Sequence, residues 1–205
     1  MKLGYALTGS FCTFEKSLQV LEEIVKKRID VVPIMSYNAY ETDTRFGDAM
    51  YFRKRIMDIT GKSIIHTIEQ AEPIGPKKMF DVLAVVPCTG NTLAKLSGGI
   101  ADTPVTMAVK SHLRNSRPVV IGVSTNDALG GAAKNIGNLL NYKNYYFVPF
   151  SQDDHINKPN SLVCDFSKVY DAVELAYDGY EISKKIKANS KIKLTHPKNE
   201  TRVGC

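Results

Sequence analysis

Residues 82–95 change pattern halfway along, and this change constrains the fold more than any other part of the chain. The first half is a continuous aliphatic and β-branched run, which is typical of a strand buried on both faces. The second half is small and hydroxylated, and Leu93, Leu96 and Ile100 then follow at helical spacing. The pattern predicts a turn from the carboxyl end of a strand into a helix, where open α/β sheets bind ligands.

The rest of the chain alternates strand and helix patterns in the same way. Alternation of this kind predicts an α/β fold, a single-domain doubly wound (Rossmann-like, flavodoxin-like) parallel sheet with helices on both faces. Two stretches lack a regular pattern: residues 37–40 are expected to form a loop, and the prolines of residues 72–76 favour an extended segment. The expected strands are residues 2–7, 29–35, 82–87, 119–123 and 145–150, with a possible short strand at 63–66, and the expected helices are 14–25, 48–59, 93–99, 104–113, 132–140 and 165–186.

Polar turns follow four of the predicted strands, at residues 8–12, 36, 88–92 and 124–127. Because the strands are predicted to be parallel, these turns should meet at one edge of the sheet. The first turn, Thr8-Gly9-Ser10, suits a phosphate through its hydroxyls and a glycine that admits close approach. An ordinary helix-capping turn explains the same residues. Neither a dinucleotide nor a triphosphate motif is present.

Charge is concentrated at the end of the chain. From residue 183 onward seven basic residues face one glutamate, which accounts for the whole formal net charge of +6. We therefore expect one globular domain over residues 1–187 and a basic polar tail over 188–205, with no nucleic-acid partner. No apolar run is long enough to span a membrane, and the start lacks a signal-peptide pattern, so a cytoplasmic protein is expected.

Cysteine and histidine positions offer no metal site. The four cysteines are scattered without a CxxC pair, and no histidines pair at ligand spacing. Cys88 sits where a helix amino end could activate a nucleophile, but no histidine lies in the same or the facing turn. A buried, inert thiol is the better interpretation of Cys88.

Two segments of the chain match a known pattern. Residues 87–95, Pro-Cys-Thr-Gly-Asn-Thr-Leu-Ala-Lys, and residues 98–102, Gly-Gly-Ile-Ala-Asp, resemble a turn of one flavoprotein family. That family contains the FMN-dependent cysteine decarboxylases and the UbiX-like flavin prenyltransferases, and the spacing from Pro87 to Asp102 also matches it. The predicted order of strands fits the family from residue 2 to about residue 150.

The resemblance implies an FMN site at the carboxyl edge of the sheet. Its phosphate would lie on the first turn and its isoalloxazine edge on the third. Residues of the fourth turn, together with a lysine, would meet the carboxylates of a substrate, and Lys110 is a further candidate for that role. The implied cofactor-binding residues are Gly9, Ser10, Phe11, Ser36, Thr89, Gly90, Asn91 and Thr92, and the implied substrate-binding residues are Ser124, Asn126 and Lys95.

Three positions depart from the family pattern. Pro73 stands where the decarboxylases carry a histidine, and proline cannot move a proton. Ser124 and Thr125 stand where the prenyltransferases carry an arginine and a glutamate, so the bidentate anchor for a prenyl phosphate is missing. The chain is therefore a poor candidate for an independent FMN-dependent decarboxylase or prenyltransferase.

Within the family, residues 4–12, 71–77 and 124–130 resemble one component of an oxidoreductase of spore-forming bacteria. That likeness implies a Rossmann-type A subunit as partner, a small dicarboxylate substrate, and NADP held by the partner. A trimer or dodecamer of this chain is also implied. The alternative is a non-catalytic structural or binding subunit that keeps the flavoprotein fold. No catalytic residue is assigned by the resemblance.

Overall fold

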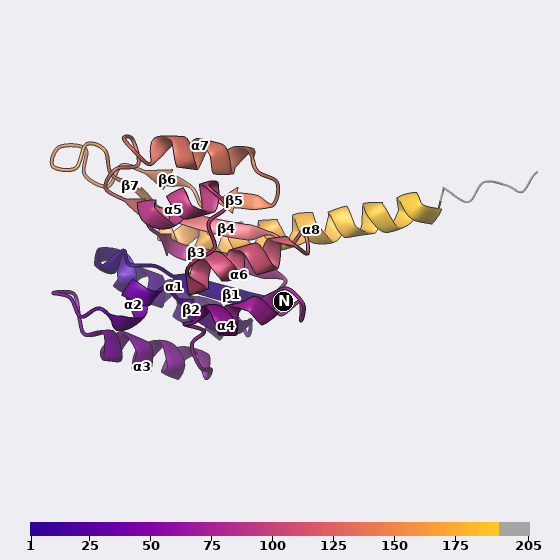
Figure 1. Ribbon diagram of the computed structural model, residues 1–205, viewed down its shortest axis with the longest axis horizontal. Coiled ribbons are helices and arrows are strands. Elements are labelled where there is room, and N and C mark those ends of the chain that lie inside the picture. The colour runs from indigo at the N-terminus through magenta and orange to yellow at the C-terminus, as the bar shows by residue number, and fades with distance from the viewer. Residues whose placement is uncertain (193–205) are drawn as a thin grey trace, which may run out of the picture.

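A sheet of seven strands forms the centre of the protein, and helices cover both of its faces (Figure 1). The computed structural model describes residues 1–192. The strands are β1 Lys2–Leu7, β2 Asp30–Met35, β3 Val82–Cys88, β4 Val119–Thr125, β5 Tyr145–Phe147, β6 Phe150–Ser151 and β7 Leu162–Cys164. The helices are α1 Phe14–Lys26, α2 Tyr37–Glu41, α3 Ala49–Thr60, α4 Ile68–Ala71, α5 Gly90–Ser97, α6 Pro104–Leu113, α7 Ala133–Asn141 and α8 Val169–Ile192, with 3-10 turns η1 Phe11–Thr13, η2 Glu72–Ile74 and η3 Phe166–Lys168.

Five strands form the parallel part of the sheet in the order β2-β1-β3-β4-β5. This order places β1 and β3 in the middle, so their side chains are buried on both faces. The prediction of an α/β sheet with helices on both faces is confirmed. The doubly wound parallel sheet is also confirmed for β1 to β5, and the pattern did not predict the antiparallel addition, in which β7 pairs with β4 and β6 pairs with β7.

Side chains on the two faces of the sheet form two separate cores, as the two-residue period of a strand requires. Leu3, Tyr5 and Leu7 of β1 join one core, which also contains residues of α1, α3 and α8. Ala6 joins the other core, with residues of α5, α6 and α7. On this second face Gly4 leaves room for a ring, since a Cβ there would lie 2.6 Å from Phe80.

Several local predictions were wrong. Residues 37–41 form α2 instead of a loop, because the Ser36 side chain accepts a hydrogen bond from the Ala39 amide and so caps a helix. Residues 72–74 form η2 instead of an extended segment, with Pro73 in the first turn, where a missing N–H costs nothing. The strand expected at 145–150 is divided between β5 and β6, and residues 63–66 provide one bridge, between Ile34 and Ile65.

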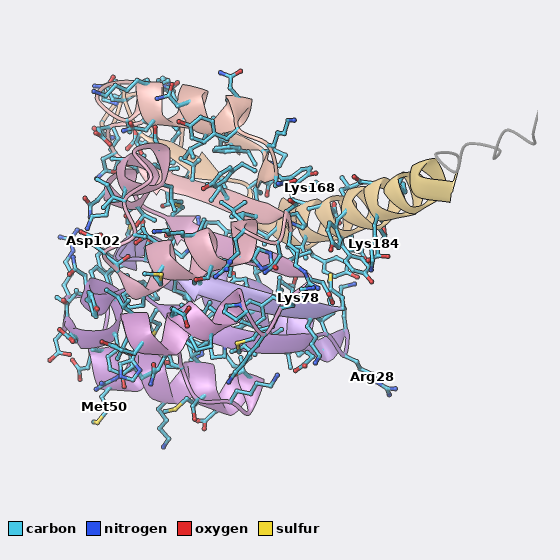
Figure 2. The ribbon with its side chains drawn as sticks, turned by 45° about the vertical axis from the view of Figure 1, so that its right-hand side comes forward. Arg28, Met50, Lys78, Asp102, Lys168 and Lys184 are labelled. Carbon is cyan, nitrogen blue, oxygen red and sulfur yellow. The ribbon has the colours of Figure 1, made fainter. Side chains whose placement is uncertain are left out.

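The closing helix is longer than expected. α8 continues to Ile192, past the predicted domain end at residue 187, and projects well beyond the body of the protein (Figure 1). Lys184 lies on the projecting part (Figure 2). The remainder of the predicted tail, residues 193–205, lies outside the described residues. Within residues 1–192, no helix combines the length and the apolar character needed to cross a bilayer.

Candidate functional site

The turns after β1 and β4 meet at the carboxyl edge of the sheet, on the left-hand side of Figure 1. The hydroxyls of Ser10 and Ser124 lie 2.8 Å apart, although 114 residues separate them in the chain. The Thr13 hydroxyl donates to the Ser10 carbonyl oxygen at 2.9 Å and lies 3.3 Å from the Ser124 hydroxyl. Since Ser124 is buried, these contacts form a polar floor inside the protein.

The turns after β1 and β3 are tied together by Thr8. Its hydroxyl donates to the Pro87 carbonyl oxygen at 2.8 Å and accepts from the Thr89 amide at 3.0 Å. The Thr8 amide donates to the same Pro87 oxygen at 3.2 Å. Thr8 is itself buried, so the two turns are held in a fixed relation.

A cavity of about 670 Å³ opens at this edge, within the range of small-molecule sites. It contains six of the predicted site residues, from both the proposed cofactor set and the proposed substrate set. Those six are Gly9, Ser10, Phe11, Thr89, Ser124 and Asn126, and the rest of the lining consists of Cys12, Thr13, Lys16, Arg45, Phe46, Thr125, Asp127, Asp153, Lys158 and Val163.

The remaining predicted residues have other positions. Ser36 caps α2, as its hydrogen bond to Ala39 shows. The Thr92 amide donates to the Thr89 hydroxyl at 3.3 Å, which caps α5, and the two hydroxyls lie 3.1 Å apart. Asn91 is exposed on the first turn of α5. Lys95 forms an ion pair with Asp102 at 2.8 Å, and this contact holds the pKa of the Asp102 carboxyl below its usual value.

Gly90 allows α5 to begin close to the exit of β4. A Cβ at this position would lie 2.7 Å from the Thr125 hydroxyl and 2.9 Å from an oxygen of Asp127. Gly9 is different, because a Cβ there would make only ordinary contact, 3.6 Å from the Phe11 ring. Of these two glycines, Gly90 is therefore the one that needs to lack a side chain, and the atoms that approach it closely belong to the protein itself.

The three cysteines that the structure describes divide between core and cavity. Cys88 is fully buried, as expected, and burial raises the pKa of its thiol; that the thiol is inert stays a prediction. Cys164 is also buried, whereas Cys12 is exposed and lines the cavity. Among the described residues, no group of three or more histidine, cysteine or carboxylate side chains could hold a metal ion.

Sequence reasoning missed several residues of the cavity, including Lys16, Arg45 and Lys158. Lys16 falls among the charged residues of the helix expected at 14–25, and Arg45 lies between the loop expected at 37–40 and the helix expected at 48–59. Lys158 lies in the loop between β6 and β7, where it forms an ion pair with Asp153 at 3.3 Å. The Ser161 hydroxyl and this lysine lower the pKa of Asp153. No sequence signal links these segments, because tertiary packing brings them together.

Known proteins match this chain in both sequence and structure. The model of the family named Flavoprotein matches residues 1–169. The B subunit of dipicolinate synthase from Bacillus subtilis is 43% identical over 175 residues, which are 85% of this chain and 88% of that protein. The crystal structure of the corresponding B subunit from Bacillus halodurans has 40% identity and a TM-score of 0.79, covering 87% of this chain and 91% of that one. The FMN-dependent cysteine decarboxylase SpaF shares the fold, with 22% identity, a TM-score of 0.66, and coverage of 86% and 97%.

The chain therefore belongs to the Flavoprotein family. Within that family, its similarity over most of its length is to the B subunit of dipicolinate synthase. Every residue that lines the cavity falls inside the segment matched by the family model. The family resemblance inferred from the turn at residues 87–102 is confirmed.

The first turn of the cavity offers donors that fit the phosphate of a flavin mononucleotide. The amides of Phe11 and Cys12 open a helical segment, so helix geometry gives them no intrahelical acceptor. Together with the Ser10 hydroxyl, they are suited to bind a phosphate. The Thr89 hydroxyl and amide are engaged in the cap of α5 and in the contact with Thr8, so they position the turn.

Proposed function

We propose that this chain is the B subunit of a dipicolinate synthase and acts with an A subunit during spore formation. The two subunits would convert dihydrodipicolinate to dipicolinate, pyridine-2,6-dicarboxylate, by a two-electron oxidation. The observation that carries the proposal is the 43% identity to a protein of this name over most of both chains. The cavity at the carboxyl edge gives the proposal a location in the molecule.

We further propose that the cavity holds FMN. Ser10 and the amides of Phe11 and Cys12 would bind the phosphate, and Ser124 would fix the position of Ser10 through their 2.8 Å contact. Thr89 would hold the edge of the site through the capped start of α5. FMN, when bound, supplies a two-electron acceptor, and NADP on the A subunit is a second one. Asn126 remains a proposed substrate-binding residue.

Lys95 keeps a proposed role in substrate binding only if its pair with Asp102 opens, because that pair now engages its ammonium group. Gly90, Asn91 and Thr92 would support the flavin site by shaping the start of α5. Ser36, at the end of β2, would do so through the cap of α2. A homo-oligomer, as a trimer or dodecamer, and a location in the mother-cell cytoplasm complete the proposal.

A direct experiment separates a flavin-binding subunit from a purely structural one. The purified full-length chain should be yellow, or should become yellow on addition of FMN, with flavin absorbance that remains after gel filtration. Dipicolinate formation should then be assayed with each subunit alone and with both, adding NADP and FMN separately. We expect activity only when both subunits are present.

Two outcomes would contradict these proposals. A colourless protein that does not bind added FMN would show that this cavity is not an FMN site. Full activity of the A subunit alone, unchanged when this chain is added, would show that this chain has no catalytic role. The chain would then be a non-catalytic subunit that keeps the flavoprotein fold.

A further inference from the structure

Two positively charged side chains that line the cavity take part in none of the ion pairs among the side chains of residues 1–184. The cavity is lined by three basic and two acidic side chains. Lys158 pairs with Asp153, and the Thr125 hydroxyl donates to Asp127 at 2.6 Å. Among the described residues, the other two basic side chains, Lys16 and Arg45, form no ion pair with a carboxylate. The site therefore carries two cationic groups available to a ligand.

The local sequence of α1 offers Lys16 no acidic partner. Residues one helical turn away are the ones that could pair with it, and these are Cys12, Thr13, Gln19 and Val20, all uncharged. The adjacent carboxylate, Glu15, is bound by Arg55 of α3 at 2.6 Å. Lys16 is thus available to a ligand while its neighbour on the same helix is engaged.

Arg45 is presented by a well-defined loop between α2 and α3. Thr44 and Gly47 exchange backbone hydrogen bonds of 3.1 and 3.0 Å, which close the loop on both sides of Arg45. Gly47 has a φ of +143°, and a Cβ there would lie 2.8 Å from the Phe52 ring, so the loop is packed onto α3. The Arg45 guanidinium lies 4.9 Å from the Phe46 ring centroid, beside the cavity.

We propose that Lys16 and Arg45 bind the two carboxylates of a dianionic ring substrate, and this inference rests on the function proposed above. The cations come from separate elements, α1 and the loop between α2 and α3, so they suit two anionic groups of one ligand. Arg45 offers a planar fork that matches a carboxylate, and Lys16 offers a point charge. Phe46, which is 46% exposed, provides an apolar surface beside Arg45 for the ring.

The test compares a dicarboxylate with its monocarboxylate analogue. Isothermal titration calorimetry measures the binding of dipicolinate and of pyridine-2-carboxylate to the full-length chain with FMN added, alone and with the A subunit. We expect the wild type to prefer the dicarboxylate by about tenfold or more, the contribution of one charged hydrogen bond. Lys16→Met and Arg45→Gln should each lower dipicolinate affinity by about tenfold and reduce that preference. Arg45→Lys, which keeps the charge without the fork, should have an intermediate effect.

Arg53→Gln is the matched control, because Arg53 lies over the Tyr40 ring at 4.6 Å, away from the cavity. Circular dichroism melts of each variant check that the fold is kept. Unchanged preference in folded Lys16→Met and Arg45→Gln proteins would overturn the inference while leaving the proposed function standing. Loss of FMN binding with unchanged dipicolinate affinity would assign the two cations to the cofactor and overturn it as well. Failure of the wild type to bind dipicolinate in any of these mixtures would contradict the proposed function itself.

Discussion

The two edges of the same sheet differ in what some of their polar side chains bond to. At the amino edge, where Arg28 and Lys78 lie (Figure 2), polar side chains bond to the backbone. His112 Nε2 donates to the Pro118 carbonyl oxygen at 3.0 Å, and Asn115 Nδ2 donates to that of Gly75 at 2.8 Å. At the carboxyl edge the Thr8 hydroxyl also bonds to a carbonyl oxygen, but the hydroxyls of Ser10 and Ser124 bond to each other beside a cavity.

This difference distinguishes polar side chains that the fold requires from polar side chains that can also bind a ligand. A side chain that satisfies a buried carbonyl is required by the fold, because breaking the contact leaves an unpaired polar group. Paired hydroxyls can each donate to a ligand instead, and they lose little when they exchange one partner for another. We therefore expect substitutions at the amino edge to change stability alone, and those at the carboxyl edge to change ligand binding as well.

The largest expected effect on the free energy of unfolding comes from the titration of His112 at the amino edge. Burial lowers its pKa to about 4 from 6.5, with a smaller opposing effect of the hydrogen bond to Pro118. Above pH 6.5 the histidine is neutral in both states and its contribution to stability is complete. As the pH falls toward 4, the unfolded chain binds a proton that the folded one excludes, which costs about 3 kcal/mol.

Urea denaturation between about pH 4 and 8 measures this effect. His112→Gln keeps a donor for the Pro118 carbonyl oxygen and removes the titration, so its free energy of unfolding should fall less with decreasing pH than that of the wild type. Carboxylates titrate in both proteins, and the difference between the two curves isolates the histidine. Parallel curves would contradict the prediction.

A matched pair of alanine substitutions tests the comparison directly. Ser124→Ala and Asn115→Ala each remove side-chain hydrogen bonding from opposite edges, and each should lower the free energy of unfolding by about 1 kcal/mol. Only Ser124→Ala should also weaken FMN binding, because Ser10 loses its fixed position. Equilibrium dialysis with FMN measures this, and equal affinities of the two variants would break the comparison.

The smallest effect is expected at the pair of Lys95 and Asp102, which lies on α5 and the segment after it. Asp102 is largely exposed, so the pair should contribute little to the free energy of unfolding. Lys95→Met should therefore melt close to the wild type and keep its FMN affinity, with Asp102→Asn as its control. Dipicolinate affinity lowered several-fold in Lys95→Met but not in Asp102→Asn would assign Lys95 a direct contact with the ligand.

Much of the fold follows from local patterns in the sequence. The strands β1 to β4 and the helices α1, α3, α5, α6 and α7 are visible as apolar runs and helical spacing, because each buries a face that its own residues define. The short strand β7 has no such signal, since its three residues are paired only by their position beside the end of β4 and along β6. Ser36 has the side chain of a helix cap, but α2 is too short for a periodic pattern.

The sequence by itself determined the family, the alternating α/β architecture and the turns that form the ligand edge. These depend on the order of residues within one segment, where hydrophobic period and turn chemistry act locally. Only the tertiary structure decided which polar groups share the cavity. Lys16 and Arg45 join the predicted Ser10 and Ser124 there, because packing onto one sheet fixes the positions of segments that are distant in the chain.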